Sequence, residues 1–126
     1  HIRPTSPQRE IKDLKKAFKV FVNSNFSSLR SVHEMSETAY KMVEIKSGHL
    51  KSLQKLNLSL DEINKPRQKL PKTYSPNGVI DIYRKKVIMN EKKLLGKKVK
   101  AFLTSRSHEI DNIADFKYLE YLWKFK

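Results

Sequence analysis

Two carboxylates near the end of the chain are its best candidates for chemistry. Glu109 and Asp111 stand two positions apart, with Ile110 between them, just before a strongly helical run. In an extended segment residues i and i+2 point the same way, so both side chains present oxygens on one side. Mg²⁺ is usually held by one or two such carboxylates together with the phosphates of a substrate. The pattern predicts a metal site, although solvated acids that favour the N-terminus of the following helix would look the same.

Arginine and amide side chains upstream are candidates for binding an anionic or sugar-like ligand. Arg67 and Gln68 lie in an irregular polar stretch, and a planar guanidinium suits a bidentate contact with a carboxylate. Asn77 followed by Gly78 indicates a turn, or an amide placed over a bound sugar where glycine lets the backbone come close. Arg3 begins a segment that reads as a strand-to-helix turn or as a ligand-binding loop at the carboxyl end of a strand. A surface arginine and an ordinary turn are the simpler explanations.

The composition indicates one domain, or a part of one, with a basic surface. The chain has 126 residues, no cysteine and a formal net charge of +14, so a disulfide scaffold and a thiolate metal site are excluded. The lysines are spread from Lys12 to Lys126, which fits a solvated surface, a phosphate-rich ligand or nucleic acid. No apolar run is long enough to span a membrane and no signal peptide precedes the chain, so we expect no membrane partner and a cytoplasmic protein. Because the chain starts at His1 rather than Met, we expect it to be the later part of a longer protein.

Helices that alternate with strands predict an α/β fold with a largely parallel sheet. The spacing of apolar residues predicts a helix from Ser6-Pro7 to about residue 24 and a second helix over 86–95 that is capped by Gly96. Strands are expected at 28–34, 79–83 and 99–103, where apolar and β-branched residues gather.

Asn112 and Asp115 predict a capped final helix. We expect its buried stripe to comprise Phe116, Leu119, Leu122 and Trp123.

The middle of the chain predicts a β-hairpin followed by a long loop. Residues 40–46 and 49–53 flank Ser47-Gly48, which is typical of a hairpin with a two-residue turn. Residues 57–75 are polar and interrupted by prolines, so we expect a loop with room for one helical turn.

In this order and spacing the motifs resemble the C-terminal half of the acylneuraminate cytidylyltransferases, which are the CMP-sialic acid synthetases and their legionaminic and pseudaminic acid relatives. The resemblance extends over essentially the whole chain, and its blocks are weak singly and fairly specific in combination. They are Arg3-Pro4-Thr5-Ser6-Pro7, Arg67-Gln68, Leu70-Pro71, Pro76-Asn77-Gly78 and Glu109-Ile110-Asp111.

The resemblance implies part of a Rossmann-like nucleotide-diphospho-sugar transferase fold. Residues 1–126 would form the C-terminal part of a single cytidylyltransferase domain, and the N-terminal CTP-binding segment of the family is absent from this chain. Residues 38–72 would be a projecting hairpin and loop through which the family forms homodimers.

The resemblance also implies a reaction, namely transfer of CMP from CTP to a nine-carbon 2-keto acid sugar, a nonulosonic acid, with release of pyrophosphate, in the synthesis of lipopolysaccharide or another surface glycan. Glu109 and Asp111 would be the catalytic acids that hold Mg²⁺. Arg67, Gln68 and Asn77 would bind the sugar, and Arg3 would line the site where many relatives have glutamine. Glu109 departs from the aspartate common in the family. Without the CTP-binding segment, the chain alone should be inactive.

Two rival hypotheses remain open. One is a basic, non-catalytic nucleic-acid-binding module, for which exposed aromatic side chains among the lysines would be the sign. We regard nucleic acid as the less expected partner, because the helical spacing of Tyr118, Tyr121, Trp123 and Phe125 suits packing better. The other is a dimeric structural remnant that has lost catalysis.

Overall fold

The computed structural model describes residues 1–53 and 57–125, and the chain divides into two compact units. Unit 1 comprises residues 1–33 with 76–126, and unit 2 comprises residues 34–75. The boundaries fall within strand β1 (Ser28–Glu34) and near the start of strand β4 (Tyr74–Tyr83). Unit 2 contains the 38–72 segment that the sequence resemblance marks as an excursion.

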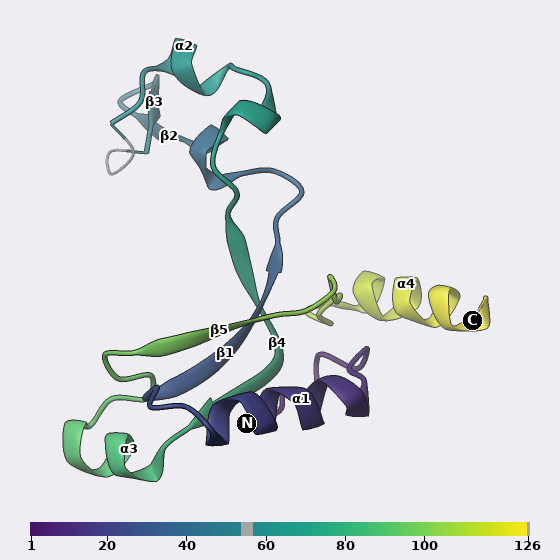
Figure 1. The fold of residues 1–126 in the computed structure, drawn as a ribbon. Coiled ribbons are helices and arrows are strands. Elements are labelled where there is room, and N and C mark those ends of the chain that lie inside the picture. The colour runs from purple at the N-terminus through teal and green to yellow at the C-terminus, as the bar shows by residue number, and fades with distance from the viewer. Residues whose placement is uncertain (54–56, 126) are drawn as a thin grey trace. The chain divides into compact units, whose positions relative to one another are not determined.

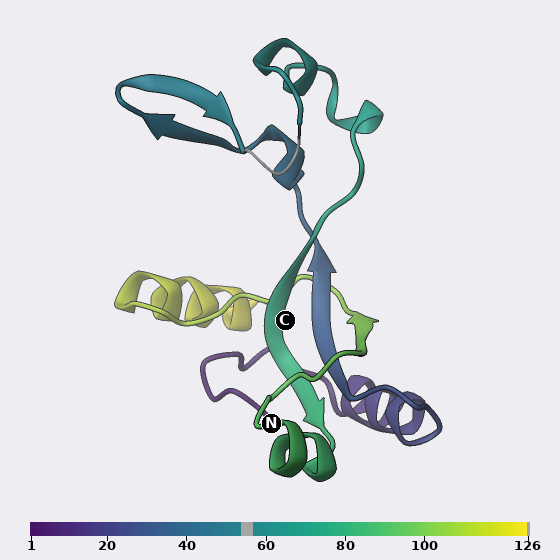
Figure 2. The ribbon, with the colours of Figure 1, turned by 90° about the vertical axis from the view of Figure 1, so that its left-hand side faces the viewer.

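Unit 1 holds a three-stranded sheet in the order β4-β1-β5, in which β5 spans Val99–Leu103. β1 and β5 are parallel, with Ser28 opposite Val99 and Val32 opposite Leu103. β4 runs in the opposite direction to β1 (Figure 2), so the sheet is mixed. The α/β prediction is confirmed, but the expectation of a largely parallel sheet is wrong for this part of the chain. An antiparallel pair needs no crossover helix packed on the sheet, and the helical turns described between β1 and β4 belong to unit 2.

The core of unit 1 forms where helix α1 (Ile11–Val22) packs on the sheet (Figure 1). Ala17 and Phe21 of α1 are buried together with Leu29 of β1; Val79, Ile80 and Phe102 complete the cluster. The predicted start of this helix at Ser6-Pro7 is wrong, because the helix begins at Ile11 after Glu10. The next helix, α3 (Lys85–Glu91), ends at Lys92 in the left-handed conformation rather than at the predicted Gly96.

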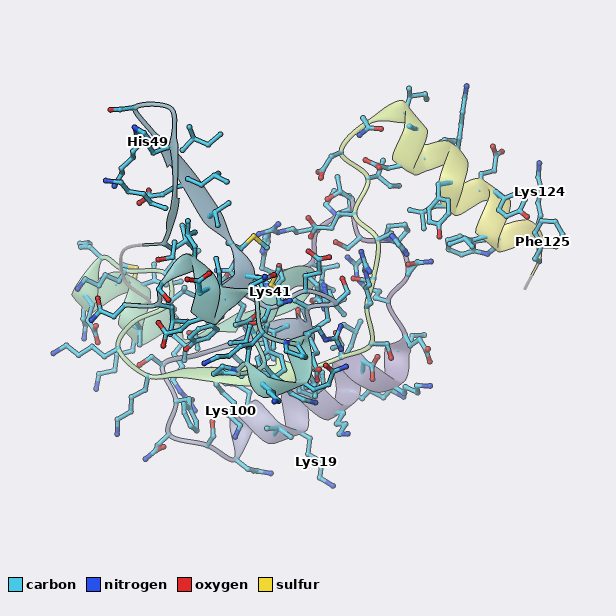
Figure 3. All side chains as sticks on the ribbon, turned by 90° about the horizontal axis from the view of Figure 1, so that it is seen from above. Lys19, Lys41, His49, Lys100, Lys124 and Phe125 are labelled. Carbon is cyan, nitrogen blue, oxygen red and sulfur yellow. The ribbon has the colours of Figure 1, made fainter. Side chains whose placement is uncertain are left out.

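Helix α4 (Ile113–Lys124) extends away from the sheet of unit 1, with Lys124 and Phe125 at its far end (Figures 1 and 3). The predicted stripe is wrong in part. Leu119 is buried and Leu122 is half-buried, but Phe116 and Trp123 are 50% and 56% exposed. Phe116, Leu119 and Trp123 line a pocket of about 220 Å³ together with Ile110 and Glu120.

The predicted cap of α4 is confirmed. The Asn112 side chain accepts from Ala114 N–H at 2.9 Å and Asp115 N–H at 3.1 Å, and Asp115 Oδ2 accepts from Asn112 N–H at 3.0 Å. Asn112→Ala removes the one oxygen that accepts both hydrogen bonds, so we expect it to lower the stability of α4 by about 1 kcal/mol. Hydrogen exchange at the Ala114 and Asp115 amides measures the loss directly. Asn112→Ser keeps a capping oxygen and is the control; equal exchange in the two variants would contradict the role of the cap.

Unit 2 contains the predicted hairpin, formed by β2 (Val43–Lys46) and β3 (His49–Ser52). Ser47 and Gly48 both have positive φ, 51° and 78°, as the favoured two-residue hairpin turn requires. A 3-10 turn, η1 (Ala39–Lys41), precedes the hairpin. The helical turn expected in the following loop is α2 (Leu60–Ile63), which starts at a Ser59–Glu62 capping box that lowers the pKa of Glu62. A second 3-10 turn, η3, spans Arg67–Lys69.

Across 1–53 and 57–125, no helix combines the length and the apolar character needed to cross a membrane.

Candidate functional site

Three segments that are far apart in the sequence meet at Gly78 in unit 1. Gly78 lies inside β4 with a φ of +63°, and a Cβ added there would lie 2.4 Å from Glu109 Oε1, 2.8 Å from Ser6 Oγ and 2.9 Å from Arg3 Cδ. Only glycine leaves room for this approach and adopts the conformation without strain. The predicted turn at Asn77-Gly78 is therefore a kinked position within a strand, and it brings Arg3 and Glu109 together.

Glu109 is held from two sides. Its Oε1 lies 3.6 Å from Arg3 Nη1 and accepts from Ser6 Oγ at 3.4 Å. The Arg3 and Glu109 side chains are 38% and 28% exposed, so the pair is partly accessible to solvent. Ile110 N–H donates to Thr5 O at 2.8 Å, which joins the backbone of the acidic segment to the N-terminal segment.

Arg9 joins the N-terminal segment to β4. Its Nε donates to Val79 O at 3.3 Å, and its Nη2 donates to Arg3 O. Burial lowers the pKa of the Arg9 guanidinium, which still stays charged at neutral pH. The backbone at Arg3 is thus attached to β4 while the Arg3 side chain is directed to Glu109.

Asn77, a predicted sugar-binding residue, is 2% exposed and engaged within the protein. Its Nδ2 donates to Thr104 Oγ1 at 2.6 Å, and its Oδ1 accepts from Val79 N–H at 3.3 Å. Its backbone oxygen accepts from Ser6 Oγ at 3.4 Å and from Ser107 Oγ at 3.5 Å. In this arrangement the amide holds the Gly78 segment in place.

Asp111 follows Glu109 on the same segment, and its side chain is exposed. Its backbone N–H donates to Asp115 Oδ2 at 3.0 Å, so the start of α4 fixes the backbone while the carboxylate faces solvent. Within the part of the chain that the structure describes, no group of three or more His, Cys, Asp or Glu side chains could hold a metal ion by itself. A cation at Glu109 and Asp111 would complete its coordination with water or with oxygens of a ligand.

Arg67 and Gln68, the other predicted sugar-binding residues, belong to unit 2, where both are exposed on η3. Arg67 Nη1 donates to Ser36 O. Nearby in the same unit, Lys72 donates to Glu34 at 2.9 Å, and this hydrogen bond raises the pKa of Lys72.

The sequence prediction missed three hydroxyl groups of the site. The sequence predicts that Ser6 begins the first helix, but Ser6 is fully buried, and its hydroxyl donates to Asn77 O and Glu109 Oε1 in distant segments. Thr104 and Ser107 both contact Asn77 from the segment after β5. Their position directly after a strand was the available signal, because ligand sites in open α/β sheets gather at the carboxyl ends of strands.

The chain is thus an α/β protein with a polar, partly accessible site at one end of a mixed sheet. No protein-family model matches the chain. It is 26% identical over 125 residues to the post-translational flagellin modification protein B of Campylobacter coli. The aligned region covers 97% of this chain and 51% of the relative, so the chain spans about half the length of the curated relative it matches.

Proposed function

We propose that the protein is a nucleotidyltransferase that moves CMP from CTP to a nonulosonic acid, a nine-carbon 2-keto acid sugar. The observation that carries the proposal is the meeting of Arg3, Ser6, Gly78 and Glu109, which come from three of the motif blocks on which the sequence resemblance rests. A relative named for post-translational modification of flagellin supports a biosynthetic role. Attachment of a sugar to a protein requires an activated sugar, and CMP-sugars are of that kind.

In the proposed reaction the anomeric hydroxyl of the sugar attacks the α-phosphorus of CTP. A bond forms between the hydroxyl oxygen and the α-phosphorus, the bond from the α-phosphorus to the oxygen of the leaving pyrophosphate breaks, and the hydroxyl proton passes to water. Both substrates are anionic, so a chain with a formal net charge of +14 would raise their concentration near the site. Arg67 would bind the sugar carboxylate, for which its planar guanidinium and exposed position are suited; Gln68 would contact a sugar hydroxyl.

The residues present fit Mg²⁺ that is bound jointly by protein and substrate. Glu109 and the exposed Asp111 supply the hard oxygen ligands that Mg²⁺ prefers, and triphosphate oxygens would complete the coordination. When bound, the ion would neutralise charge on the triphosphate. Asp111 would be the more available ligand, because Glu109 already contacts Arg3 and Ser6.

We further propose a homodimer formed through unit 2. Ile45 and Leu50 are paired across the hairpin and are 75% and 55% exposed, which leaves an exposed apolar pair on a two-stranded sheet. Such a hairpin is marginal in water unless its apolar face is covered. Sedimentation equilibrium of the native protein distinguishes a dimer from a monomer, and a monomer at all concentrations would contradict this proposal.

Arg67→Ala should weaken use of the sugar more than use of CTP. Loss of a charge-assisted contact costs about 1.5–3 kcal/mol, which corresponds to a fall of about ten- to a hundredfold in kcat/KM for the sugar. Steady-state kinetics with each substrate varied in turn measures the difference. Lys69→Ala removes a neighbouring exposed charge from η3 and is the matched control. Equal effects of Arg67→Ala on both substrates would remove Arg67 from the sugar site.

The alternative function, a basic nucleic-acid-binding module, is favoured by one observation. Tyr118, Tyr121 and Phe125 of the α4 segment are 49%, 59% and 74% exposed, close in sequence to Lys117 and Lys124. Exposed aromatic rings among lysines are typical of surfaces that stack single-stranded bases. Fluorescence anisotropy with a labelled oligonucleotide at several salt concentrations tests it, and salt-sensitive binding that Tyr121→Ala weakens would support it.

Release of pyrophosphate from CTP tests the proposed function, measured on the native protein with any residues that precede His1 included. We expect release only when a nonulosonic acid is present, and a preference for CTP over the other nucleoside triphosphates. Release without the sugar would indicate a hydrolase, and no release with any nonulosonic acid would contradict the proposal.

A further inference from the structure

The Arg3 guanidinium lies beside the Glu109 carboxylate that a bound cation would use. Its Nη1 lies 3.6 Å from Glu109 Oε1, and Ser6 Oγ lies 3.4 Å from the same oxygen. Mg²⁺ requires ligand oxygens at about 2.0–2.1 Å, so an ion on this oxygen would lie within a few ångströms of the guanidinium. Two positive charges at that separation repel each other.

The surrounding contacts allow the Arg3 side chain to move while its backbone stays in place. The Arg3 carbonyl accepts from Arg9 Nη2 and from Ser6 N–H, the latter at 3.3 Å. The Arg3 side chain, in contrast, is 38% exposed, and its ion pair with Glu109 is longer than a good hydrogen bond. A weak, partly hydrated pair of this kind can open at small cost.

We propose that Arg3 is a built-in counter-ion of Glu109 that competes with a divalent cation for this carboxylate. The inference rests on the proposed function, in which Glu109 and Asp111 hold the cation. Cation binding releases the Arg3 guanidinium, which then faces the same site and is free to contact an anionic group of the substrate. Arg3 is therefore a positioning residue that couples cation binding to substrate binding.

The test measures Mn²⁺ binding to the native protein by electron paramagnetic resonance, with no nucleotide or sugar present. Mn²⁺ accepts the same hard oxygen ligands as Mg²⁺ and gives a signal while free. Arg3→Gln removes the charge and keeps a long polar side chain, and we expect it to bind Mn²⁺ about fivefold more tightly than the unmodified protein. Arg106→Gln, which removes an exposed arginine from the loop after β5, is the matched control for the general loss of positive charge.

The added variant Asp111→Asn locates the ion. Combined with Arg3→Gln, Asp111→Asn should abolish the gain in Mn²⁺ affinity, because only the Glu109 carboxylate is then left to bind the ion. Equal Mn²⁺ affinity in the unmodified protein and in Arg3→Gln, including no measurable binding in either, overturns the inference, as does an equal gain in Arg106→Gln. If CMP-sugar forms and requires Mg²⁺ while Arg3→Gln shows no gain, only this inference fails; a gain without CMP-sugar formation contradicts the proposed function alone.

Discussion

Gly78→Ala should both destabilise the protein and displace Glu109. A left-handed backbone costs a residue with a Cβ about 1–2 kcal/mol. The new methyl group would also lie 2.4 Å from Glu109 Oε1 and 2.8 Å from Ser6 Oγ, so the carboxylate or the strand has to move. We expect a total loss of roughly 2–4 kcal/mol of unfolding free energy by urea denaturation, together with loss of catalysis.

Gly48→Ala is the matched control, because Gly48 also has a positive φ, 78°, and an added Cβ would have nothing within 4 Å. Gly48→Ala should therefore lower the free energy of unfolding only by the cost of the left-handed backbone. A second test combines Gly78→Ala with Glu109→Ala, which removes the crowded carboxylate. The cost of Gly78→Ala should be smaller in that background, as expected for residues in contact. Equal losses for Gly48→Ala and Gly78→Ala, with no coupling to Glu109, would contradict the close packing of the site.

Asp111→Asn should greatly reduce turnover without unfolding the protein. Asn keeps the volume of the side chain. The hydrogen bond from Asp111 N–H to Asp115 Oδ2 uses the backbone of residue 111 and not its carboxylate, so it should remain. Metal stabilisation of a transition state is worth several kcal/mol. A loss of about 2.7 kcal/mol corresponds to a fall in kcat of about a hundredfold.

Asp61→Asn provides the comparison, because Asp61 is an exposed aspartate in the first turn of a helix in unit 2. It should leave kcat unchanged. The measurements are kcat at saturating substrates and the circular dichroism spectrum of each variant. Full activity of Asp111→Asn with an unchanged spectrum would remove the metal role from Asp111.

Elements that are determined by residues close together in the sequence were predictable. The strands at 28–34 and 99–103, the turn at Ser47-Gly48 and the Asn112–Asp115 capping box match the prediction because β-propensity, turn conformation and capping are local properties. The pairing of Arg3 with Glu109 was indicated only indirectly, by motif blocks that had to meet if the resemblance held.

The exposure of α4, the partners of Ser6 and the direction of β4 depend on tertiary contacts, which the spacing of residues along the chain does not show. The spacing of α4 shows which residues share a face, but exposure of Phe116 and Trp123 depends on what packs against that face. Ser6 looked like a cap because Ser-Pro commonly begins a helix, whereas its partners are residues 77 and 109. The direction of β4 depends on the route through unit 2, and the order of strands along the chain does not record it.

Direct detection of the product tests the central proposal most simply. The native protein is incubated with CTP, Mg²⁺ and a nonulosonic acid, and the products are followed by phosphorus NMR and mass spectrometry. The proposed function predicts a phosphodiester signal and a mass equal to CMP joined to the sugar, with one pyrophosphate released for each CMP-sugar formed. CTP that remains unchanged with every nonulosonic acid supplied, or that yields only CMP and pyrophosphate, would contradict it.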